Sequence, residues 1–304
     1  MGGAARVYAS TWSERPFGLI IAGSGEGADW NATANSMRAS LGQTKPVEII
    51  SGTFGTKEVQ KAVDRLQAQK VKKIVVLWLD LYSQSSDIEQ LKYLLGINKF
   101  PSRAYMDSWK LKGRKLTRVK SKVPIVIAGG LDDHPAVSAV LESRAAPMSR
   151  SPGEESVVVV GYGSSLDEEN AVKQNILESL ARSMESAGGY KIVRTALIRP
   201  PTKQKPRLHD DSIRTLRAVI KDLSIRSRVI VVPHLLTRDG RERRLKKDLD
   251  NLFFRWRGQA ILPDEKIIAW LGEIAQKASA LENMVEFKDD GQALGPEKRE
   301  RFVK

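Results

Sequence analysis

The chain has 304 residues, of which 41% are hydrophobic and 28% are charged, a composition typical of a soluble globular protein. Its formal net charge of +14 favours anionic partners. The absence of cysteine excludes disulfides, thiolate metal sites and a cysteine nucleophile, and no apolar run is long enough to span a membrane.

Apolar runs alternate along the chain with segments of helical periodicity, which predicts an α/β fold with parallel sheets flanked by helices. The expected strands are 17–22, 46–51, 73–81, 123–128, 156–161, 190–197 and 228–236. The expected helices are 30–41, 55–69, 86–96, 134–142, 167–186, 210–223 and 241–254. A further helix is expected from about 264 to 283, packed on the second half of the chain.

The chain repeats itself. Residues 17–31 and 156–170 both run from an apolar strand through Gly-x-Gly into an acidic helix start that contains Asn, and 72–95 is echoed by 227–249. This repeat predicts two flavodoxin-like domains that arose by internal duplication, with a cleft between them. The expected boundaries are a first domain over 15–142, a linker over 143–155, a second domain over 156–284 and a frayed polar tail over 285–304.

Polar residues follow the strands in both halves. His234 comes at the end of an apolar strand, where ligand crevices form in α/β folds, and is the candidate catalytic residue. Tyr82–Asp87 follows another strand, and its hydroxyls either hold a carboxylate or phosphate or cap the next helix. In the second half Arg238, Arg241 and Glu242 occupy the matching turn, where guanidinium groups suit carboxylate recognition.

The other two histidines are predicted to belong to helix starts. Asp133-His134-Pro135 is typical of a helix N-cap with proline in the first turn, and His209 stands before two aspartates in the same way. The three histidines have no chelating spacing, so the sequence predicts no dedicated metal site.

Several of these motifs resemble the class II chelatases, in particular the two-domain CbiX-type sirohydrochlorin cobaltochelatases of cobalamin biosynthesis. In that family a strand ends in His-Gly followed by Trp-Asn or Glu-Asn, matched here by Trp30-Asn31 and Glu169-Asn170. The family's Ser-Ser-His-Ser-Ser turn and Tyr-Leu-Leu-Gly helix end are matched by 82–86 and 93–96. The resemblance spans roughly residues 17–275 and implies two chelatase domains that face each other across a cleft for a tetrapyrrole.

The departures from the family fall on its histidines, because Ser24, Gln84 and Tyr162 stand at those positions. Metal insertion removes two pyrrole protons, and imidazole serves both as metal ligand and as base near neutral pH. Hydroxyl, amide and phenol groups do neither well. The resemblance therefore implies a chelatase, a lyase by class, in which insertion of Co²⁺ or Fe²⁺ as substrate is weakened or lost. Whether the chain is an enzyme at all stays open.

The expected partner is an anionic tetrapyrrole-like small molecule held by Ser24, Gln84, Ser85, Tyr162, Arg238, Arg241 and Glu242. A binding or scaffold protein that kept the fold and lost the chemistry is the alternative. The segment from Lys99 to Lys122 contains nine basic residues and one acidic residue. This basic run suggests a nucleic-acid partner as a third hypothesis. Sparse aromatic residues and the lack of a known motif disfavour it. Residence is expected to be cytoplasmic, or periplasmic if a signal peptide was removed; the oligomeric state is left open.

Overall fold

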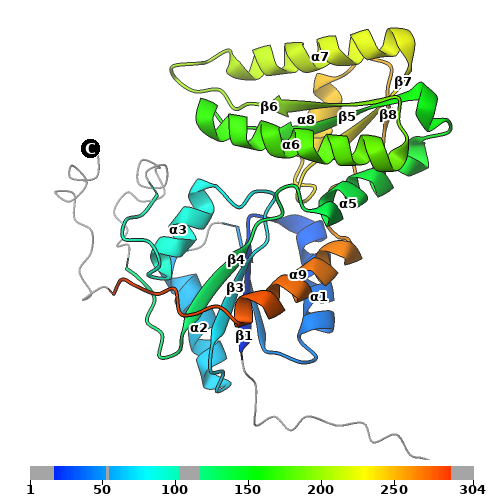
Figure 1. The fold of residues 1–304 in the computed structure, drawn as a ribbon. Coiled ribbons are helices and arrows are strands. Elements are labelled where there is room, and N and C mark those ends of the chain that lie inside the picture. The colour runs from blue at the N-terminus through cyan, green and yellow to red at the C-terminus, as the bar shows by residue number, and fades with distance from the viewer. Residues whose placement is uncertain (1–16, 53–54, 103–116, 289–304) are drawn as a thin grey trace, which may run out of the picture.

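The structure is a computed structural model, and it describes residues 17–52, 55–102 and 117–288. Two parallel four-stranded sheets lie in the two halves of the chain (Figure 1). The first has the order β2-β1-β3-β4, formed by β1 (Gly18–Gly23), β2 (Val47–Ser51), β3 (Ile74–Trp78) and β4 (Ile125–Gly129). The second repeats this order as β6-β5-β7-β8, formed by β5 (Glu155–Tyr162), β6 (Ile192–Ile198), β7 (Arg228–His234) and β8 (Arg255–Trp256).

The predicted fold class is therefore confirmed: an α/β protein with two similar halves. The central strands β1 and β3 are buried along their whole length because both faces of the sheet are covered. Alternate residues enter different cores, so that Leu19 and Ile21 pack on one face while Ile20 packs on the other. Each fully buried Leu or Ile side chain contributes about 1.5–3 kcal/mol.

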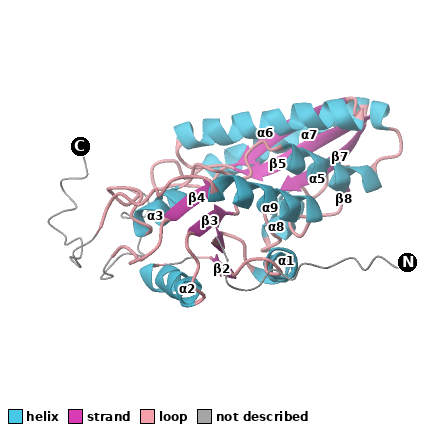
Figure 2. Ribbon diagram, turned by 60° about the horizontal axis from the view of Figure 1, so that its bottom comes forward, coloured by secondary structure: helices cyan, strands magenta, loops and turns pink. Residues whose placement is uncertain are grey.

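Helices lie on both faces of the sheets, as Figure 2 shows. The helices of the first half of the sequence are α1 (Gly27–Leu41), α2 (Thr56–Ala68), α3 (Ser86–Leu94) and α5 (Pro135–Ala145). Those of the second half are α6 (Asp167–Gly188), α7 (Leu208–Arg226), α8 (Arg241–Asp248) and α9 (Glu265–Ser279). None of these described helices combines the length and apolar composition that a membrane crossing needs.

The prediction for His134 is confirmed: its Nδ1 accepts a hydrogen bond from the Ala136 amide, and Pro135 opens α5. His209 instead lies inside the first turn of α7, whose N-cap is Arg207. The predicted helix over 241–254 is too long, because α8 ends at Asp248 and Arg255–Trp256 forms the short edge strand β8 beside Ile230 and Val231.

The two halves exchange a helix. Helix α5 follows the first sheet in sequence but packs on α6 and β7 of the second half. Helix α9 packs on β3, β4 and α1 of the first half, so the expectation that the C-terminal helix covers the second half is wrong (Figure 1). Arg144 joins α5 to the segment that leads into α9. Its guanidinium donates to the carbonyls of Ala260, Ile261 and Pro263 and pairs with Asp264 at 3.1 Å.

The chain after α9 does not fray at Met284. The Met284 amide donates to the Ile125 carbonyl at 3.0 Å, so this segment runs along the outer edge of β4. The amides of Glu286 and Phe287 both donate to the Gly96 carbonyl at 2.9 Å. Residues 285–288 thus extend the described fold, whereas 289–304 and most of the basic run, 103–116, lie outside the described residues.

Candidate functional site

The carboxyl ends of the central strands face each other across the seam between the two halves. Tyr82, just beyond β3, meets His234 at the end of β7, with ring centroids 5.9 Å apart in an edge-to-face arrangement. In open α/β sheets ligands bind outside these strand ends. The seam is therefore a candidate ligand-binding or catalytic site.

His234 is fully buried at this seam. Neither ring nitrogen has a hydrogen-bond partner among the described residues, and the Tyr82 hydroxyl is unpartnered too. Burial lowers the pKa of His234 from 6.5 to about 4, so the imidazole is neutral at pH 7. In this arrangement a substrate would reach the ring only if the halves separated, and the catalytic role of His234 stays a prediction.

Asp80 is the chemically notable residue at the end of β3, and the sequence analysis did not single it out. Burial raises the pKa of its carboxyl, although hydrogen bonds from the Ser24 hydroxyl and the Leu81 amide oppose that rise. The Leu81 amide lies 2.6 Å from Asp80 Oδ1. A carboxylate whose pKa is raised is a better proton acceptor than an ordinary one. The signal in the sequence was a lone acid inside the apolar run 74–82.

The turn between β3 and α3 contains a helix cap and an exposed side-chain amide. Ser85 is the N-cap of α3, and its Oγ accepts from the Ile88 amide at 3.4 Å, so the capping interpretation of this serine holds. Gln84, one residue earlier, is exposed. Ser24 is also exposed at the end of β1, where it donates to Asp80.

In the second half a cationic pocket opens beside Tyr162. It has a volume of about 300 Å³ and is lined by Tyr162, Gly163, Ile198, Pro200, Pro201, His209, Arg241 and Arg244. The Arg241 guanidinium lies 5.3 Å from the centre of the Tyr162 ring, and Arg244 Nη2 lies 3.4 Å from His209 Nε2. Burial raises the pKa of Tyr162, which therefore stays a neutral phenol and a hydrogen-bond donor at pH 7.

Asp239 partly neutralises this pocket. Its carboxylate accepts from Arg241 Nε and lies 2.7 Å from Arg241 Nη2. Glu242 is turned to its own helix start, where Oε2 accepts from the Gly240 amide at 2.9 Å. The carboxylates of Asp239 and Asp248 both lie close enough to raise the pKa of Tyr162, and they offset part of the charge of the two guanidinium groups. Because Asp239 pairs with Arg241, Arg244 is the guanidinium left to bind a small anionic group.

Arg238 is engaged across the seam. Its backbone amide, Nε and Nη2 all donate to Asp29 of α1, with Nη2 2.6 Å from Asp29 Oδ1. Burial alone would raise the pKa of Asp29, but the hydrogen bonds and charge of Arg238 hold it below its ordinary value. This pair joins the halves, and the predicted ligand role of Arg238 stays a prediction.

The structure thus divides the predicted residues into two groups. Tyr162 and Arg241 share the cationic pocket, whereas Ser24, His234 and Arg238 lie along the seam with Asp80 and Asp29. Among the described residues, no three His, Cys, Asp or Glu side chains are grouped so that they could hold a metal ion.

No protein-family model matches the chain, and no curated protein matches it. Solved structures do. SirB from Bacillus subtilis with Fe³⁺ has a TM-score of 0.61 at 13% identity over 87% of this chain and 96% of that one. SirB from Bacillus subtilis subspecies spizizenii, a sirohydrochlorin chelatase in complex with cobalt, has a TM-score of 0.56 at 12% identity over 88% and 99%.

A third structure is DR2241 from Deinococcus radiodurans, a multi-domain protein described as structurally similar to chelatases with two additional domains. It has a TM-score of 0.56 at 15% identity over 91% of this chain, which matches 58% of DR2241. Their shared fold is the one that the sequence resemblance predicts. At these identities the similarity concerns the fold alone.

Proposed function

We propose, from the premise that this chain has the class II chelatase fold, that it binds an anionic, sirohydrochlorin-like tetrapyrrole and inserts metal into it weakly or not at all. The single observation that carries the binding proposal is the pocket beside Tyr162, where Arg241 and Arg244 converge. Sirohydrochlorin-type tetrapyrroles carry acetate and propionate groups, and guanidinium groups bind carboxylates through paired, charge-assisted hydrogen bonds.

The proposed loss of insertion rests on the groups that remain at the strand ends. Ser24 is exposed but donates to Asp80, Gln84 is an uncharged amide, and Tyr162 is a neutral phenol. The one imidazole at the seam is enclosed and has a lowered pKa. In this proposal Asp80 is the remaining group able to accept a pyrrole proton, with Ser24 as its positioning partner.

Binding is tested by titrating sirohydrochlorin into the protein and following the absorption spectrum. We expect the double change Arg241→Ala and Arg244→Ala to weaken binding about tenfold or more, because hydrogen bonds to charged groups contribute about 1.5–3 kcal/mol each. The matched control, Lys246→Ala with Lys247→Ala, removes the same charge from the same helix outside the pocket lining. Equal weakening by both pairs would indicate diffuse electrostatics and sink the pocket proposal.

Insertion is tested separately by adding Co²⁺ or Fe²⁺ as substrate to the bound complex. We expect a rate barely above the uncatalysed one, since a general base ordinarily contributes about 10²–10⁴-fold. Any residual rate should fall on Asp80→Asn, which keeps the shape and removes the proton acceptor. Rapid insertion that survives this substitution would contradict both the proposed loss and the role of Asp80.

The alternative, a scaffold protein that kept the fold without a ligand, has its own support. Arg238, Glu242 and Ser85 are engaged in internal contacts. If the titration detects no binding by the parent protein, this alternative replaces the tetrapyrrole proposal.

A further inference from the structure

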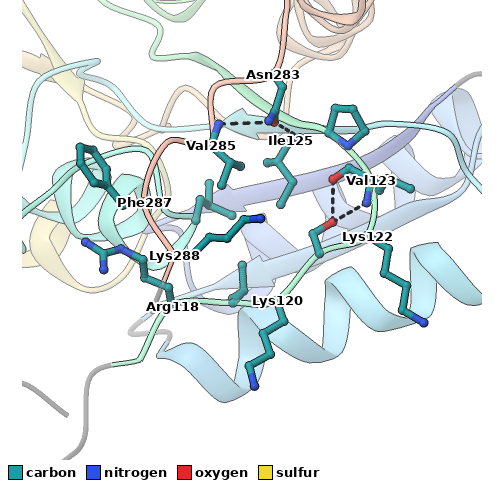
Figure 3. Close-up of a pocket in the computed structure, with 13 residues that line it drawn as sticks. Arg118, Lys120, Lys122, Val123, Ile125, Asn283, Val285, Phe287 and Lys288 are labelled. Carbon is teal, nitrogen blue, oxygen red and sulfur yellow. Dashed lines mark hydrogen bonds between the residues drawn. The ribbon is translucent and has the colours of Figure 1, made fainter. Parts of the chain in front are cut away.

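One lysine is enclosed at the seam between the two halves. Most of the described lysines are exposed, as Lys120 and Lys122 are where they line a recess beside β4 (Figure 3). The side chain of Lys173, in α6, is only 13% exposed. Its ammonium lies 2.9 Å from Glu169 Oε1, one helical turn earlier, and 5.0 Å from the centre of the Tyr82 ring. Because Tyr82 belongs to the first half and Lys173 to the second, this positive charge lies between the halves.

The ammonium acts on two carboxylates, one from each half. On the side of α6, the Glu169 carboxylate also accepts from the Ser164 hydroxyl at 2.7 Å. Burial alone would raise the pKa of Glu169, but the hydrogen bonds from Lys173 and Ser164 hold it below its ordinary value. On the side of β3, burial raises the pKa of Asp80, and the charge of Lys173 opposes that rise. The ammonium therefore stabilises the charged forms of both carboxylates.

Three carboxylates act on the Tyr82 hydroxyl. Tyr82 is 7% exposed, and its hydroxyl has no hydrogen-bond partner among the described residues. Burial raises the pKa of this hydroxyl, and the charges of Asp80, Asp132 and Glu169 raise it further. Asp132 is fixed beside the turn by the Ser83 amide, which donates to its Oδ1 at 2.8 Å. Carboxylate oxygens around an enclosed, unpartnered phenol oxygen are ligands of the kind that divalent cations bind.

This group of oxygens already has a cation. The Lys173 ammonium is tied to α6 through its own side chain, so it neutralises the carboxylates without the entropic cost of capturing a free ion from solution. A divalent ion that entered the same space would be repelled by the ammonium at short range, where burial weakens screening. Without the ammonium, the carboxylates would lose their counter-charge, and an inorganic cation could supply it.

Lys92 of α3 offers the contrast of an ordinary helical ion pair. Its ammonium lies 2.8 Å from Glu89 Oε1, but the two side chains are 28% and 43% exposed. The other oxygen of Glu89 accepts from the neutral amide of Asn98. Lys173 is distinguished from Lys92 by its enclosure and by the carboxylate and phenol that the opposite half of the molecule brings to it.

We propose that the Lys173 ammonium occupies the cation position of the seam, so that the protein binds no divalent metal ion between Asp80, Tyr82 and Glu169. The inference deepens the proposed function, on which its link to metal insertion rests, because a fixed ammonium would keep Co²⁺ or Fe²⁺ away from the strand ends. Occupancy of the cation position is nevertheless a property of the protein alone, and it can be measured without a tetrapyrrole.

The test is a calorimetric titration of Co²⁺ into the protein alone. Lys173→Met keeps an unbranched side chain and removes its charge. We expect this variant to bind Co²⁺ about tenfold more tightly than the parent or better, because the repelling charge is gone and the carboxylates have lost their counter-charge. Lys173→Arg keeps the charge and should behave as the parent does. Adding Glu169→Gln or Asp80→Asn to Lys173→Met should remove the gain, which locates the ion at the seam.

The matched control is Lys92→Met, which takes the lysine away from the single carboxylate of Glu89 and should gain no Co²⁺ binding. Circular dichroism checks that every variant keeps its fold. The absence of a gain in Lys173→Met, or an equal gain in Lys173→Arg or Lys92→Met, would overturn the proposal. Tight Co²⁺ binding by the parent that is lost on Glu169→Gln would overturn it as well, and this measurement needs no lysine variant. Failure of the parent to bind sirohydrochlorin would contradict the proposed function instead, and would leave these cation titrations unaffected.

Discussion

A His234→Leu variant is expected to keep about 3 kcal/mol of unfolding free energy that the parent protein loses between pH 7 and pH 4. Burial lowers the pKa of His234 from 6.5 to about 4 in the folded state. The unfolded chain therefore takes up its proton at a higher pH than the folded one, and stability falls as the pH is lowered. The loss is absent above about pH 6.5 and nearly complete at pH 4. A difference of one pKa unit between the folded and unfolded states is equivalent to about 1.4 kcal/mol.

At pH 7 the same variant is expected to be as stable as the parent or more so. Leucine removes two ring nitrogens that lack partners among the described residues, and replacing unpaired buried polar atoms with apolar ones is near neutral or stabilising. Urea denaturation at pH 7, 6, 5 and 4 measures the difference between variant and parent. The control is His209→Leu, which removes an imidazole from the half-buried pocket edge and leaves the seam unchanged. A parental profile for His234→Leu would mean that the His234 ring is solvated or paired, contrary to the structure.

Arg238→Ala is expected to lower the unfolding free energy by about 2–3 kcal/mol at pH 7. The substitution leaves the Asp29 carboxylate, 3% exposed, with the backbone amide of residue 238 in place of the full set of donors. Removing one partner of a buried pair costs up to about 3–5 kcal/mol, and the half-exposed guanidinium of Arg238 places this case at the lower end. Because the lost contacts join the two halves, the substitution should also make their separation easier.

The pH dependence of this effect has a definite sign. Arg238 lowers the folded-state pKa of Asp29, so its stabilisation is present above the ordinary value of 3.8 and is lost as the pH falls through the lowered value. Arg241→Ala is the matched control, because its partner Asp239 lies two residues away in the same exposed turn and such pairs contribute about 0–1 kcal/mol. If Arg238→Ala and Arg241→Ala lower the unfolding free energy equally, the Asp29–Arg238 pair does not hold the two halves together.

The strands and most helices could be predicted because their signals are local. Runs such as Val157–Val160 are apolar at every position and so predict a strand covered on both faces, and His134-Pro135 carries its own helix start. The strand β8 was missed because its two residues, Arg255 and Trp256, follow a charged helix without any apolar run. Its identity as a strand comes from pairing with β7, which the local sequence does not encode.

The site was only partly predictable, for a related reason. Gly-x-Gly placed Ser24 and Tyr162 at strand ends, where the structure has them, and the polar turn after β7 placed Arg241, which opens α8. The partner of each polar group was not predictable, since Asp29 and Arg238 are 209 residues apart and meet only after both halves have folded. Asp80 was overlooked because a single acid in an apolar run resembles a strand end, and its chemistry depends on burial.

The exchange of α5 and α9 makes the two halves interdependent during folding and in evolution. A fragment that stops at the linker would carry α5 with its buried face, including Val137 and Leu141, exposed to water, and would leave β3 and β4 uncovered where α9 belongs. The remaining fragment would have the opposite defect. A nick between 149 and 154 would therefore yield two pieces that stay associated, each completing the core of the other. If the ancestral single domain folded alone, its last helix must have packed on its own sheet or been exchanged with a second copy in a homodimer.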